Sequence, residues 1–96
     1  MALRLVREIL LCAVIGAPAN AACFADYKAK QDEPLRLAYG VAEIPDSGCG
    51  SLDAAAAALA PRLAAAGWTL LGVVSIFGPE GLDERKESAG DHFLRY

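Results

Sequence analysis

Residues Gly67–Phe77 have the sequence GWTLLGVVSIF, the longest β-forming apolar run after the first residues of the chain. Trp68–Phe77 contains no charged residue, and apolar side chains fall on both faces of the strand that it predicts. Gly67 follows an Ala-rich segment, at the position where helices commonly end in glycine. We therefore expect a strand that is central or covered on both sides and that organises the rest of the chain.

The elements before this strand follow from periodicity and from helix-breaking residues. Leu35–Ile44 alternates larger apolar residues with small or polar ones, which predicts a strand with one covered face. Pro45–Gly50 is a loop by composition, and Ser51 can cap a helix over Leu52–Ala66. Pro61 removes a backbone hydrogen bond inside that helix, so we expect a kink or a break just before it.

The elements after the strand are shorter. Gly78–Gly81 predicts a turn, Leu82–Ala89 a short charged helix, and the alternating Asp91–Tyr96 a last strand. Ala22–Pro34 is the N-terminal arm of the expected mature chain, and Asp26–Gln31 within it is compatible with either a helical turn or a ragged strand. These assignments predict one α+β domain of two layers, in which a three-stranded sheet packs with one long Ala-rich helix and one short helix, in the order β-α-β-α-β.

The first 21 residues have the features of a secretory signal peptide. Arg4 and Arg7 precede the apolar run Ile9–Ala17, and Ala19–Ala21 places small residues at both positions that signal peptidase recognises. We expect cleavage after Ala21, which leaves residues 22–96 as a single domain. The nine apolar residues of the run are too few to cross a bilayer core, which needs about 20, so we expect no stable membrane anchor.

Cleavage would leave 75 residues with seven basic and eleven acidic side chains, a net charge of −4. No basic cluster is present, which argues against a nucleic-acid partner. Cys12 would leave with the signal, and the remaining pair, Cys23 and Cys49, predicts a disulfide in an oxidising compartment. Closing its loop of 27 residues corresponds to about 3–4 kcal/mol of stabilisation in the chain-entropy account.

Gly67–Val73 matches the pattern Gly-Trp-x-Leu-x-x-Val and resembles the signature of a small bacterial β-α-β-β domain family of unknown function. The resemblance covers Leu52–Val74, with Phe93–Tyr96 as a further strand, and it implies a compact fold. The insert Gly78–Gly90 departs from the short hairpin of that family. The end of the chain, from Phe77, is similar to short exported proteobacterial proteins. Neither resemblance implies a catalytic residue.

Groups suited to catalysis or metal binding are few. His92 is the only histidine, no serine lies in a nucleophile-elbow pattern, and we expect no catalytic residue and no cofactor. We interpret His92 as a surface histidine with its hydrogen bonds satisfied. Asp83 and Glu87, four residues apart on the short helix, are candidates for a hard cation, although a solvated helix face explains the same spacing.

Five aromatic residues are candidates for an interaction surface if one face of the sheet is uncovered. They are Tyr39, Trp68, Phe77, Phe93 and Tyr96. Our leading functional prediction is a non-enzymatic periplasmic or secreted module that binds an unidentified protein or a second copy of itself.

Two alternatives remain beside it. One is a binder of a small ligand or cation that uses Asp83, Glu87 and the glycine-rich loop Gly48–Ser51. The other is thiol redox chemistry at Cys49, whose thiolate a helix N-terminus can favour. No Cys-x-x-Cys motif accompanies it.

Overall fold

The computed structural model describes residues 23–96, and the expected signal peptide lies outside these residues. The strands are β1 (Cys23–Gln31), β2 (Arg36–Ile44) and β3 (Thr69–Phe77), and the helices are α1 (Leu52–Ala65) and α2 (Asp83–Ala89). Three short 3-10 turns connect them: η3 (Asp46–Gly48), η4 (Pro79–Gly81) and η5 (Gly90–His92). The α+β class, the number of strands, and the long and the short helix are as predicted, but the order along the chain is β-β-α-β-α and not β-α-β-α-β.

The sheet is antiparallel, with strand order β2-β1-β3. β1 is therefore the central strand, and neither alternative expected for Trp68–Phe77 holds, because β3 lies at an edge of the sheet and its Leu71 and Val74 side chains are exposed. The register of β1 with β2 is unbroken from Cys23↔Ile44 to Gln31↔Arg36. The register of β1 with β3 shifts twice, which leaves Leu71 and Val74 without a partner position on β1.

Asp91–Tyr96 does not form the expected last strand. It contains the end of η5 and a single isolated bridge between Val41 and Phe93, with the Leu94 N–H donating to the Val41 carbonyl at 2.8 Å. Leu94 has a φ of 55°, which interrupts an extended backbone and stops the ladder after one hydrogen bond. The third strand is instead β1, which lies in the N-terminal arm, a segment for which the sequence allowed either a helical turn or a strand.

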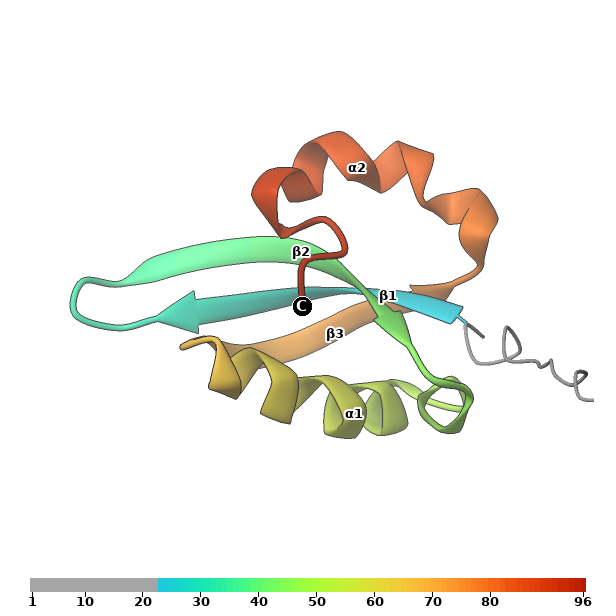
Figure 1. The fold of residues 1–96 in the computed structure, drawn as a ribbon, viewed down its shortest axis with the longest axis horizontal. Coiled ribbons are helices and arrows are strands. Elements are labelled where there is room, and N and C mark those ends of the chain that lie inside the picture. Colours follow the sequence, from blue (N-terminus) through green and yellow to red (C-terminus); the bar gives the residue numbers. More distant parts are fainter. Residues whose placement is uncertain (1–22) are drawn as a thin grey trace, which may run out of the picture.

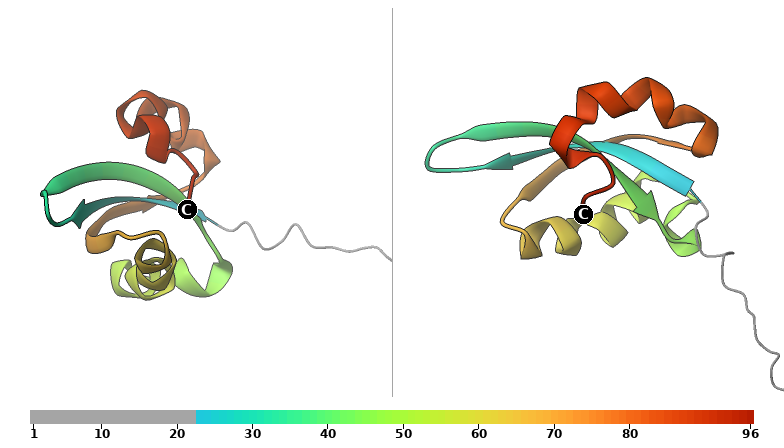
Figure 2. Two further views of the ribbon diagram at one scale, coloured as in Figure 1. Left: turned by 60° about the vertical axis from the view of Figure 1, so that its left-hand side comes forward. Right: turned by 45° about the horizontal axis from the view of Figure 1, so that its top comes forward.

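The two helices lie on opposite faces of the sheet (Figures 1 and 2). The expected two-layer arrangement is therefore replaced by a sheet with α1 on one face and α2 on part of the other. The main core lies on the α1 side and contains alternate residues of β1 packed against the apolar face of α1. These residues are Cys23, Ala25, Tyr27, Ala29, Ala42, Ile44, Ala55, Leu59 and Leu63.

Helix α1 continues through Pro61 without interruption, so the expected break is absent. Pro61 is exposed, as is Ala57, whose carbonyl would otherwise accept the missing hydrogen bond. Water can satisfy that carbonyl, which explains how the helix accommodates the proline. No helix within residues 23–96 is both long and apolar enough to span a membrane.

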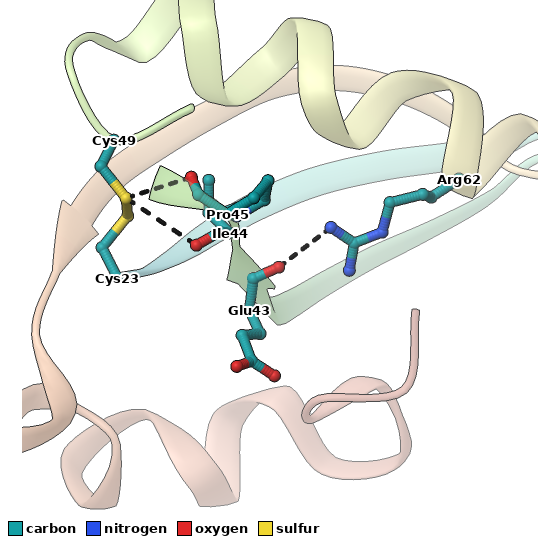
Figure 3. Close-up of a disulfide and its surroundings, with 6 residues drawn as sticks. All are labelled: Cys23, Glu43, Ile44, Pro45, Cys49 and Arg62. Carbon is teal, nitrogen blue, oxygen red and sulfur yellow. Dashed lines mark hydrogen bonds between the residues drawn. A yellow bond between two sulfur atoms is a disulfide. The ribbon is translucent and has the colours of Figure 1, made fainter. Parts of the chain in front are cut away.

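The predicted disulfide between Cys23 and Cys49 is present, with the two Cα atoms 6.1 Å apart (Figure 3). It joins the start of the central strand to the turn before α1. The carbonyl oxygens of Ile44 and Pro45 approach Cys49 Sγ at 3.8 and 3.4 Å. Because a bridged sulfur carries no proton, these are close contacts only, and the covalent bond is what holds the two segments together.

Candidate functional site

A buried carboxylate fixes α2 to the sheet. Asp26 of β1 faces α2, is only 5% exposed, and accepts hydrogen bonds from three side chains. The Ser75 hydroxyl donates to Oδ1 at 2.7 Å, and the Tyr39 hydroxyl donates to Oδ2 at 2.7 Å. Arg85 Nε donates to Oδ2 at 3.2 Å. Asp26 thus ties together all three strands and α2.

The charge of Asp26 is stabilised where it lies. Burial alone would raise the pKa of this carboxyl, but the hydrogen bonds from Ser75, Tyr39 and Arg85 and the guanidinium charge outweigh burial and lower the pKa. The carboxylate therefore stays ionised at neutral pH. With its oxygens occupied by donors, Asp26 is arranged to hold α2 in place.

Arg85 also packs against the neighbouring aromatic residues. Its guanidinium lies 3.9 Å from the centre of the Phe77 ring, and Nη1 donates to the Gly81 carbonyl at 2.8 Å. The Phe77 ring stacks in turn against Phe24, with ring centres 6.3 Å apart. These contacts cover the sheet around Asp26 and Phe77 and leave the part toward the β1–β2 turn uncovered.

That uncovered part contains a hollow of about 270 Å³. Six residues line it: Lys28, Ala29, Leu37, Ala38, Tyr39 and Leu71. Leu37 is 71% exposed and Leu71 is 54% exposed. We call the surface formed by Lys28, Leu37, Tyr39 and Leu71 the open sheet face. The β1–β2 hairpin that carries most of it extends beyond both helices (Figure 1).

The open sheet face is apolar, with one cation at its margin. Lys28 pairs in register with Tyr39 and is exposed, and no carboxylate of residues 23–96 lies within ion-pair distance of it. The next lysine along β1, Lys30, is 3.4 Å from Asp32 and so is partly neutralised. The surface thus combines exposed leucine side chains with one uncompensated positive charge.

The five candidate aromatic residues do not gather on one surface. Tyr39 lines the open sheet face, whereas Phe77 lies beneath Arg85. Trp68 and Tyr96 pack on the core side of the sheet. Phe93 lies at the outer edge of β2, where its ring is 6.0 Å from Lys86 Nζ.

Sequence reasoning missed Lys28, Leu37 and Leu71 as members of the surface. The alternation of Leu35–Ile44 predicts a strand with one covered face, whereas the structure leaves Leu37 on that face exposed. A signal for this exposure was present in the sequence. The short helix is shorter than the strands, so it cannot cover the whole length of their apolar face.

His92 is more enclosed than expected for a satisfied surface residue. Its ring makes an edge contact with Trp68 at 5.2 Å and stacks on Tyr96 at 5.9 Å, measured between ring centres. His92 Nδ1 is buried and has no hydrogen-bond partner within residues 23–96, and the same is true of the Tyr27 hydroxyl. Packing with aromatic rings explains the position of His92.

The structure separates the parts of the predicted ligand or cation site. Asp83 and Glu87 are exposed on α2, whereas Gly48–Ser51 precedes α1, which lies on the other face of the sheet (Figure 2). Ser51 instead caps α1, accepting a hydrogen bond from the Ala54 N–H at 3.0 Å. Within residues 23–96, no group of three or more His, Cys, Asp or Glu side chains is placed to hold a metal ion.

Comparison of the chain with known protein families, with curated proteins and with solved structures finds no match. The resemblance of Gly67–Val73 to a small domain family therefore stays a prediction.

Proposed function

We propose that this protein is an exported, disulfide-bonded module that binds another protein through its open sheet face. The observation that carries the proposal is the exposure of Leu37 and Leu71 at the hollow beside α2. Contiguous exposed apolar side chains in small soluble domains commonly mark contact surfaces. Burying both leucines against a partner would remove apolar surface that this fold leaves in water.

The size of the hollow favours a protein partner over a small ligand. Pockets for drug-sized molecules usually enclose about 300–1,000 Å³, and the hollow is smaller, about 270 Å³, and open. One or two side chains of a partner fit such a space. Interfaces commonly place a few anchoring side chains in shallow pockets and surround them with less critical contacts.

The disulfide supports the proposed compartment. Bonds such as that between Cys23 and Cys49 persist in oxidising compartments and are rare in reducing ones. Together with the signal features of residues 1–21, it supports export to the periplasm or the medium. Mass analysis of the natural protein tests this directly, since export predicts a chain beginning at Ala22 with no free thiol. A full-length chain with reduced cysteines would contradict export.

Site-specific photo-crosslinking in the native host tests the binding surface. A benzophenone amino acid at Leu71 lies in the hollow, and the same group at Ala64 lies on the exposed side of α1 as a matched control. We expect a discrete crosslinked product from position 71 and none from position 64. Equal crosslinking at both positions, or none at position 71, would contradict the proposed surface.

A further inference from the structure

We infer that the partner contributes an extended acidic peptide, which adds as a fourth strand to the outer edge of β2 at residues 36–40. This inference rests on the proposed function and specifies the chemistry of the partner. Addition of a strand to a sheet edge is a common mode of peptide recognition, in which backbone hydrogen bonds supply affinity and alternate side chains supply specificity.

The chain itself already occupies half of the β2 edge. Arg62 Nη1 donates to the Glu43 carbonyl at 2.9 Å (Figure 3), and the Leu94 N–H donates to the Val41 carbonyl at 2.8 Å. Outward-pointing backbone groups alternate along an antiparallel strand. Since residues 43 and 41 point outward, Tyr39 and Leu37 also direct their N–H and C=O away from the sheet.

At Tyr39 and Leu37 the edge is open. No backbone hydrogen bond from outside the sheet reaches these two residues within the described part of the chain. Regular pairing of β1 with β2 keeps this part of the edge evenly spaced, because the register runs through all nine pairs without a shift. A peptide strand here would continue the line of hydrogen bonds begun at Val41.

The opposite edge of the sheet is less suited to strand addition. β3 carries two register shifts, at Leu71 and Val74. Bulges of this kind twist an edge and interrupt its hydrogen-bonding groups, and they are a common protection against pairing with other chains. The regular edge of β2 is therefore the one available for docking.

Side chains on the two faces of β2 define the peptide. Residues that pair with Leu37 and Tyr39 would point to the open sheet face, where apolar side chains reach the hollow. Residues that point to the other face would meet Arg36, for which no carboxylate partner exists within residues 23–96. The unpaired ammonium of Lys28 further disfavours a basic peptide. The complementary ligand alternates apolar and acidic residues.

Two features could oppose such a ligand, and neither prevents it. The exported chain, residues 22–96, carries a net charge of −4, but charges more than about 8 Å away are largely screened at physiological salt. The second feature is that another copy of the chain could pair with the same outer edge of β2 and so compete with the peptide. Antiparallel pairing of two β2 strands about Ala38 would place Leu35 of one copy at Val41 of the other, where Phe93 and Leu94 already lie. A peptide can end before that point.

The test uses the exported, disulfide-bonded protein and a fluorescein-labelled peptide of about eight residues that alternates valine and glutamate. Fluorescence anisotropy should show saturable binding that weakens as salt is added. The same peptide with lysine in place of glutamate should not bind. Absence of binding by the valine–glutamate peptide, or equal binding by both peptides, would overturn the inference.

Two variants and one control locate the site. Leu37→Pro removes an outward N–H but no bond of the β1–β2 ladder, and it should weaken binding at least tenfold. Arg36→Glu should weaken binding of the acidic peptide by about two- to fivefold and allow the lysine peptide to bind. Val74→Glu, on the bulged edge of β3, should leave binding unchanged. Circular dichroism checks that each variant is folded. If Leu37→Pro does not fold, the exchange of peptide preference in Arg36→Glu tests the site instead.

The remaining outcomes separate this inference from the proposed function. A wild-type dimer that Leu37→Pro abolishes would place a second copy on the edge and overturn the peptide assignment. Crosslinking from position 71 together with failure of every peptide would preserve the proposed surface and remove this inference. Binding that Leu37→Pro and Arg36→Glu leave unchanged would also remove it, because the peptide would then lie elsewhere.

Discussion

Removing one oxygen atom from Tyr39 or from Tyr27 is expected to change stability in opposite directions. The Tyr39 hydroxyl donates to the buried carboxylate of Asp26 at 2.7 Å. The Tyr27 hydroxyl, on the opposite face of the sheet, is buried and has no hydrogen-bond partner within residues 23–96. Tyr39→Phe therefore deletes a hydroxyl that donates a hydrogen bond, whereas Tyr27→Phe deletes a buried hydroxyl that makes none in the described part of the chain.

The expected magnitudes follow from these two environments. A hydrogen bond to a charged group contributes about 1.5–3 kcal/mol, so Tyr39→Phe should lower the free energy of unfolding by about 2 kcal/mol. A buried hydroxyl without a partner costs about 1–3 kcal/mol in proteins. Tyr27 is 1% exposed, so Tyr27→Phe should raise the free energy of unfolding by about 1 kcal/mol. At about 4–8 °C per kcal/mol for a domain of this size, the two melting temperatures should separate by roughly 12–24 °C.

The assay is chemical unfolding with the disulfide intact, followed by far-ultraviolet circular dichroism and by the fluorescence of Trp68. Equal denaturant dependence in both variants would show that only stability has changed. If Tyr27→Phe destabilises the protein as much as Tyr39→Phe does, the Tyr27 hydroxyl has a hydrogen-bond partner after all, and the reasoning is refuted.

Alkaline pH gives an independent check on the same residues. Burial, followed by the nearby Tyr96, raises the pKa of Tyr27 to about 12. Burial and the hydrogen bond to Asp26 raise the pKa of Tyr39 to about 12. Because both pKa values lie above the ordinary value of 10.0, ionisation of these tyrosines does not reduce stability below about pH 10, and stability falls as the pH rises toward 12. Tyr27→Phe should reduce that loss.

Three further predictions follow from named contacts. Replacing Cys23 and Cys49, which are 26 residues apart in sequence, with serine should lower the free energy of unfolding by about 3.5 kcal/mol, as measured by urea unfolding. The pKa of Asp26 is lowered from 3.8, so its contribution is present above that pH and lost in acid; the stabilities of wild type and Asp26→Asn should therefore differ at pH 7 and converge below pH 4. Gly40→Ala places a Cβ against the Tyr27 ring and should destabilise the protein by about 1–3 kcal/mol in a thermal melt.

The elements that sequence predicted correctly depend on local signals. α1 follows from the Ser51 cap and the spacing of its leucines, and its first residue, Leu52, was placed correctly. β2 follows from alternation, and the disulfide from the count of cysteines left after the expected cleavage. Each of these features is set by residues close together in the chain or by a simple pairing rule.

The central strand could not be recognised in this way. β1 has the sequence CFADYKAKQ, in which lysines and a buried aspartate dilute the apolar pattern and alanines supply little hydrophobic signal. Its burial depends on α1 on one side and on α2 on the other. Both helices come later in the chain, so local composition does not reveal their cover.

The coverage of the sheet was unpredictable for a similar reason. The cluster that fixes α2 joins Asp26 to Ser75, 49 residues away, and to Arg85, 59 residues away. No local pattern marks three polar residues as partners over such separations. The leucines of the open sheet face are exposed because of where that cluster places α2, so local sequence patterns could not predict their exposure either.

The two sheet edges differ in how readily another strand could pair with them. β3 has no charged side chain, so by composition its edge would be the more prone to pair with a strand of another chain. Its two bulges at Leu71 and Val74 counteract this by disrupting the spacing of its outward hydrogen-bonding groups. β2 has an even register but carries Arg36, and Arg62 and Leu94 already occupy its far end. Among residues 23–96, only the short segment around Leu37 and Tyr39 is both regular and open, and a site that short favours a peptide whose charge and alternation match it over indiscriminate pairing.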